Sequence, residues 1–128
     1  MSEKPSFRTP LGRVRWLGAA HFGTEEAMRL RLTSLALVPL TIAFVWILLT
    51  LLAKDYNGAR AELSEPLPAL LVLMFVLAGV YHMTIGMRSV IVDYLPGAAR
   101  EWALTANTLF CGALGLACVY AILRIGFV

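Results

Sequence analysis

The chain has 128 residues, of which 59% are hydrophobic and 15% charged, and its mean hydropathy is +0.76. Soluble domains average about 45–50% apolar and about 25% charged residues, and a globule of this size has too little interior to bury the excess. The formal net charge of +3 is too small and too scattered to suggest a nucleic-acid-binding protein. The composition excludes a soluble or disordered chain and predicts an integral membrane protein with no room for a large independent catalytic domain.

Three stretches are long and apolar enough to span a bilayer, which takes about 20 helical residues. They run from about Leu32 to Ala53, from about Leu67 to Tyr94 and from about Trp102 to Ile125. We expect an all-α membrane protein with three transmembrane helices, in which residues 1–31 form a polar N-terminal tail and residues 32–128 form one membrane domain.

The connections between these stretches are predicted to be one polar loop, Lys54–Pro66, and one short turn, Leu95–Glu101. Ser64 is expected to cap the second helix, with Pro66 in its first turn. Pro39 lies inside the first span, where a membrane helix tolerates proline and bends at it.

The basic residues are distributed unevenly around the spans. Most of them precede the first span: Lys4, Arg8, Arg13, Arg15, Arg29 and Arg31. The loop after this span holds only Lys54 and Arg60, and the far end of the chain holds Arg124. Because basic flanks of membrane helices remain in the cytoplasm, we expect the N-terminus and the Leu95–Glu101 turn to face the cytoplasm.

The second span holds ionisable side chains, which cost roughly 2.5–3.5 kcal/mol each in a bilayer and are functional candidates for that reason. At about 100° per residue, one helix face carries small residues, an imidazole and a carboxylate: Gly79, His82, Gly86, Ser89 and Asp93. The imidazole of His82 either hydrogen-bonds a neighbouring helix or serves as an axial haem ligand beside residues small enough to admit a flat group. In the second case Arg31 and Arg88 are candidates to bind the haem propionates, and a second intramembrane histidine would have to come from another chain.

Asp93 and Tyr94 end the second span about 16–18 Å beyond His82 along the helix axis. In one interpretation they are an interfacial carboxylate and a membrane-belt tyrosine. In the other they form part of a quinone site, because a phenol can donate a hydrogen bond to a quinone carbonyl and a carboxylate can relay protons from water.

The third span is rich in small residues. Cys111, Gly112, Gly115 and Cys118 are expected to be positions of close helix packing. At helical rise the two cysteines lie about 10 Å apart, which is beyond disulfide reach.

The run from His82 to Tyr94 (HMTIGMRSVIVDY) resembles the H-x-x-x-G-[MI]-x-x-[VI]-x-x-D-Y signature of the hydrophobic membrane anchor subunits of succinate dehydrogenase, in their smaller D-type form. The segments Thr9–Arg15, Gly23–Glu25 and Arg29–Thr33 are similar to the alphaproteobacterial branch of that family. The three-helix plan agrees as well, so the resemblance covers essentially the full chain.

The resemblance implies a multi-pass subunit of respiratory complex II in the bacterial inner membrane. It implies that His82 is an axial ligand of haem b, shared with a second, C-type anchor subunit, and that Arg31 lies near the propionates. It further implies that Tyr94 hydrogen-bonds ubiquinone, with Asp93 beside that site. The iron–sulfur and flavoprotein subunits would be held on the cytoplasmic face. Many members carry a histidine about six residues before the Arg31 position; this chain has Glu25 there, which leaves any role of that histidine unassigned.

We therefore expect a membrane anchor that passes electrons from succinate to quinone only as part of a complex, without catalysing a reaction alone. One alternative is a non-redox membrane protein, such as a transporter subunit or an assembly factor, in which His82 and Asp93 form a proton path. Another is the anchor of a quinol:fumarate reductase, because the potential of the quinone sets the direction.

Overall fold

The computed structural model describes residues 22–127 of the chain. This part contains four helices and no strand: α2 (Phe22–Leu52), α3 (Tyr56–Ser64), α4 (Pro66–Tyr94) and α5 (Gly97–Phe127). Three of them are long and apolar enough to cross a membrane, which confirms the predicted all-α membrane fold. The tail segment Thr9–Arg15 and the first four basic residues of the tail lie outside the described residues.

Two of the long helices begin earlier than the predicted spans. Helix α2 starts at Phe22 rather than near Leu32, so the end of the predicted tail is helical. Glu25 lies in its first turn, where the positive end of the helix dipole favours a carboxylate, and it pairs with Arg29 four residues on. Helix α5 starts at Gly97, whose φ of 59° is a conformation that glycine adopts without strain.

The segment predicted as a simple polar loop contains helix α3, so that prediction was wrong. The side chain of Asp55 caps α3 by accepting a hydrogen bond from the backbone N–H of Gly58 at 3.1 Å. Lys54 and Glu62 form an ion pair along the segment. These local interactions stabilise a short polar helix that hydropathy alone does not reveal.

The expected cap of α4 was also wrong. The hydroxyl of Ser64 donates to the carbonyl of Ala61 at 2.7 Å within α3, and the N-cap of α4 is Glu65, which makes no side-chain capping bond. Pro66 does occupy the first turn, as predicted. Backbone N–H groups in the first turn have no acceptor within the helix, so a proline there costs no hydrogen bond.

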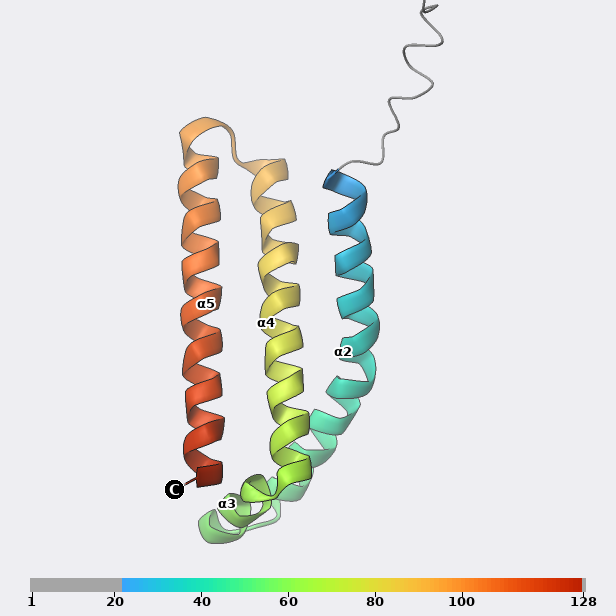
Figure 1. Ribbon diagram of the computed structural model, residues 1–128, viewed down its shortest axis with the longest axis vertical. Helices are drawn as coiled ribbons and strands as arrows, with labels where there is room; N and C mark the ends of the chain where they lie inside the picture. Colours follow the sequence, from blue (N-terminus) through green and yellow to red (C-terminus); the bar gives the residue numbers. More distant parts are fainter. Residues whose placement is uncertain (1–21, 128) are drawn as a thin grey trace, which may run out of the picture.

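The three long helices lie side by side in a row, with α4 in the middle (Figure 1). Helix α4 packs against both α2 and α5, whereas α2 and α5 make no contact with each other. Helix α2 remains continuous through Pro39 and curves in its second half toward α3 (Figure 1). A row of this kind has two broad faces and almost no interior.

Burial reflects this arrangement. Among the described residues only five apolar side chains are buried: Ile47, Pro68, Ile85, Ile91 and Cys111. Many large apolar side chains of the three long helices remain exposed. Because such a surface is unstable in water, the faces require lipid or the helices of another protein.

Small and polar residues join α4 to α5. The side-chain amide of Asn107 donates to the backbone carbonyl of Thr84 at 3.1 Å, and the thiol of Cys111 contacts the amide oxygen of Asn107 at 3.4 Å. A Cβ atom added at Gly115 would lie 3.3 Å from Cγ1 of Val80. Close packing is thereby confirmed at Gly115, where a larger residue would press against α4, and at Cys111, whose side chain is only 2% exposed.

The remaining predictions for α5 have different outcomes. A Cβ atom added at Gly112 would meet nothing within 4 Å among the described residues, so close packing was wrong for that position within this chain. Cys118 is half-buried, and both cysteines are free, as their predicted spacing requires. On the other side of α4, the rings of Phe44 and Phe75 stack at 4.4 Å and join it to α2.

Candidate functional site

His82 lies near the middle of α4 and is half-buried against α2. Its Nδ1 atom lies 3.0 Å from the hydroxyl oxygen of Thr33. The same hydroxyl lies 2.9 Å from the carbonyl oxygen of Arg29 and 3.0 Å from that of Leu30. A hydroxyl has one proton and two lone pairs, so a proton directed at these carbonyls leaves its oxygen to accept from the ring.

We therefore assign the ring proton of His82 to Nδ1. Its Nε2 atom then carries an available lone pair, which is the form in which imidazole binds metals. The hydrogen bond to a neighbouring helix was one of the two interpretations of this residue, and the structure shows it. It does not exclude the other interpretation, because it uses only one of the two ring nitrogens.

The imidazole borders an open groove of about 440 Å³ along α2. Besides His82, residues of α2 line it: Ser34, Leu37, Val38, Thr41 and Ile42. On α4, a Cβ atom added at Gly79 would meet nothing within 4 Å, and one added at Gly86 would meet only a methyl group of Leu30 at 4.0 Å. The helix face around His82 thus leaves space beside the ring.

The donor set at this position is a single imidazole. No cluster of three or more histidine, cysteine, aspartate or glutamate side chains occurs among the described residues. A lone imidazole suits a metal that brings most of its own ligands, as the iron of a porphyrin does. The residues present therefore fit a haem on one side, with the remaining contacts left to another chain.

The two candidate propionate-binding arginines differ in their surroundings. The Nε of Arg88 lies 2.9 Å from a carboxylate oxygen of Glu26 on α2, and both side chains are partly exposed. Arg31 is exposed and forms no ion pair within the described part of the chain. Arg31 is thus the more available cation for a carboxylate ligand.

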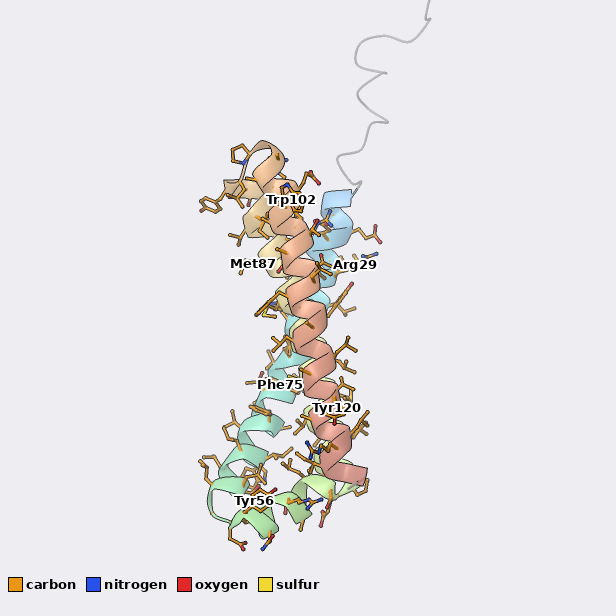
Figure 2. The ribbon with its side chains drawn as sticks, turned by 90° about the vertical axis from the view of Figure 1, so that its left-hand side faces the viewer. Arg29, Tyr56, Phe75, Met87, Trp102 and Tyr120 are labelled. Carbon is orange, nitrogen blue, oxygen red and sulfur yellow. The ribbon has the colours of Figure 1, made fainter. Side chains whose placement is uncertain are left out.

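Asp93 and Tyr94 are the last two residues of α4. Both are exposed, and the tyrosine retains 81% of its accessible surface. The structure does not bring them to His82, because about 16–18 Å of helix separates the positions. They lie at the same end of the row as the start of α2, where Figure 2 also shows Arg29 and Trp102.

Two partners escaped the sequence reasoning: Thr33 beside His82 and Glu26 beside Arg88. They are seven residues apart, so they lie on one face of α2, which is the face that packs against α4. A helix predicted to begin at Leu32 could not reveal this spacing. The signal becomes visible once α2 begins at Phe22.

Residues 5–122 of the chain match the family described as succinate dehydrogenase/fumarate reductase transmembrane subunit. The chain is 32% identical over 118 residues to the succinate dehydrogenase hydrophobic membrane anchor subunit of Paracoccus denitrificans, with 92% of each chain covered. It is 30% identical over 108 residues to the subunit of the same name from Rickettsia bellii, covering 81% of this chain and 84% of that one. No solved structure matches the chain.

These relatives confirm the resemblance carried by the His82–Tyr94 run and leave the transporter and assembly-factor alternative without support. With three membrane-crossing helices in place, the chain belongs to the succinate dehydrogenase/fumarate reductase transmembrane subunit family, as a hydrophobic membrane anchor of succinate dehydrogenase.

Proposed function

We propose that this anchor holds haem b through Nε2 of His82 and forms one wall of the ubiquinone-reduction site with Tyr94 and Asp93. The observation that carries the proposal is the hydrogen bond between His82 and Thr33. It fixes the ring and leaves Nε2 without this partner, and the residue borders a groove with space for a flat group.

Each residue has a defined task toward the haem. His82 would hold the haem iron through Nε2, and a histidine of the C-type anchor would provide the second protein ligand, because His82 is the only histidine of the sequence within a predicted span. Arg31 binds a propionate as a free guanidinium. Arg88 can bind a propionate only if it first releases the carboxylate of Glu26. When bound, the haem supplies a one-electron carrier within the membrane.

At the end of α4, the Tyr94 phenol donates a hydrogen bond to a quinone carbonyl, and Asp93 relays protons from the aqueous side. The exposure of Tyr94 leaves its hydroxyl available to a ligand that other subunits enclose. The C-type anchor and the iron–sulfur subunit complete this pocket, and electrons from succinate arrive through the flavoprotein and the iron–sulfur clusters. The names of the relatives favour this direction over fumarate reduction.

The charge distribution supports an N-terminus in the cytoplasm of a bacterial cell, with the helices in the inner membrane. Basic residues before and at the start of α2 outnumber those at the α3 end, as expected for a cytoplasmic flank. Tyr94 then faces the cytoplasm, where the flavoprotein and iron–sulfur subunits dock.

The decisive experiment is a visible and electron paramagnetic resonance spectrum of the purified complex carrying His82→Gly. We expect loss of the low-spin haem b signals and their recovery when free imidazole is added. His21→Gly, which alters the other histidine of the chain, is the control and should keep the native spectrum. A native spectrum in the His82→Gly complex would refute the proposal.

A further inference from the structure

A second cavity lies far from His82, between α3 and the C-terminal part of α5. It measures about 570 Å³, and its polar lining consists of two arginines and two tyrosines: Tyr56, Arg60, Tyr120 and Arg124. Helix α3 and the end of α5 lie at the opposite end of the row from Tyr94 (Figure 1). Figure 2 shows Tyr56 and Tyr120 in this half of the molecule. The cavity is therefore separate from both proposed redox sites.

The lining of this cavity is cationic. No carboxylate is among its lining residues, and within residues 22–127 neither Arg60 nor Arg124 forms an ion pair. Two acidic side chains of the same segment have other partners, since Glu62 pairs with Lys54 and Asp55 caps α3, and the third, Glu65, does not line the cavity. Two guanidinium groups without an internal anion favour a ligand with negatively charged oxygens, above all a phosphate, which arginine binds in a bidentate manner.

A purely apolar pocket adjoins the cationic cavity. It measures about 160 Å³ and is lined by side chains of α3, α4 and α5: Leu63, Ala69, Val72, Ala121, Ile122 and Ile125. Leu63, Ala121 and Ile125 line both spaces. A ligand that fills both must be charged at one end and apolar at the other.

The location suits the same kind of ligand. Arg124 lies in the last turn of a helix that crosses the membrane, and α3 is a short polar helix joining two such helices. The cationic cavity is thus placed at the level of lipid headgroups, and the apolar pocket continues from it between the helices. Basic pockets between transmembrane helices bind anionic lipid headgroups on the cytoplasmic side of other membrane proteins, and the same pairing of guanidinium with phosphate is available at this end of the row.

We propose that this surface binds one anionic phospholipid. Arg60 and Arg124 bind its phosphate, Tyr56 and Tyr120 donate hydrogen bonds to the headgroup, and an acyl chain enters the pocket beside Leu63 and Ala121. The lipid would fix α3 to the end of α5 and close the otherwise open end of the row.

The test uses the intact complex, purified and stripped of loosely bound lipid, with phosphatidylglycerol as the probe. We expect native mass spectrometry to show retained phosphatidylglycerol and added lipid to raise the Tm. In the Arg60→Gln/Arg124→Gln double variant, affinity should fall roughly tenfold or more for each guanidinium that is removed. Arg100→Gln removes one positive charge at the opposite end of the row, outside the cavity lining, and it should bind lipid as the native protein does.

A second variant separates a lipid from a free phosphate. Val72→Phe fills the apolar pocket, which Val72 lines without lining the cationic cavity, so it should weaken phosphatidylglycerol binding while both arginines remain. Phosphatidylcholine and inorganic phosphate should not reproduce the rise in Tm. The proposal would be overturned if the native complex and the Arg60→Gln/Arg124→Gln complex retained equal amounts of lipid. Equal stabilisation by inorganic phosphate alone would also overturn it, and so would a cross-link showing that another subunit fills the cavity.

Discussion

Replacing Thr33 by valine tests the proposal that the Thr33 hydroxyl prepares His82 to bind a haem. Valine keeps the shape of threonine but removes the hydroxyl that accepts the ring proton at 3.0 Å. A ligand histidine whose outer nitrogen donates a hydrogen bond is a more basic ligand and favours the oxidised metal. Loss of this bond should therefore raise the reduction potential of the haem.

The size of the effect follows from the strength of one hydrogen bond. Because the shift reflects only the difference in this bond between the two redox states, a typical net value of about 0.5–1.5 kcal/mol sets an upper limit of about 20–65 mV for a one-electron couple, at about 59 mV per tenfold change. Without its partner, the ring is also free to rotate, so the low-spin electron paramagnetic resonance signal should broaden. Redox potentiometry of the purified complex, followed through the haem absorption band, measures the shift.

Two further variants make the result interpretable. Thr33→Ser restores a hydroxyl and should return the potential toward the native value. Thr41→Val changes a threonine that lines the same groove but forms no hydrogen bond with the ring, whose Nδ1 is bonded to Thr33, and it should leave the potential unchanged. If Thr33→Val also left the potential and the spectrum unchanged, Thr33 would not position His82 as a ligand.

Two other predictions concern the quinone site and the packing of the helices. Tyr94→Phe removes one hydrogen-bond donor, so kcat/KM for quinone should fall about two- to tenfold, while succinate oxidation by a soluble artificial acceptor persists. Equal loss of both activities would contradict a quinone-specific role, as would the same loss in the control variant Tyr81→Phe. Gly115→Leu places a side chain against Val80 and should destabilise the α4–α5 contact by about 1–3 kcal/mol, seen as a lower Tm of the complex. Gly112→Leu, at a position with open space, should leave the α4–α5 contact intact, and an equal loss in both variants would refute the packing argument.

The sequence was sufficient for the features that depend on one helix alone. Hydropathy located the three spans, and helical periodicity placed His82, Asp93 and Tyr94 on α4. Features that join two helices were not predictable. The Thr33–His82 bond and the Glu26–Arg88 pair depend on which faces of α2 and α4 meet, and hydropathy does not encode this choice because lipid tails are as apolar as leucine.

Helix α3 was missed for a different reason. Its residues include Asn57 and Gly58, which are typical of turns, and its stability comes from the Asp55 cap and the Lys54–Glu62 pair. Such interactions depend on the geometry of a few side chains rather than on a repeating pattern. The row arrangement was likewise unpredictable, since three apolar spans could equally pack as a triangle.

The row of helices has a consequence for the life of the protein before it joins its complex. A triangular bundle could shelter its polar side chains in its own centre, but a single layer leaves Thr33, His82 and Asn107 near its surfaces. We expect the newly made subunit to be short-lived when alone and to persist once its sister subunits arrive. Its cellular abundance should then follow the supply of those subunits rather than its own rate of synthesis.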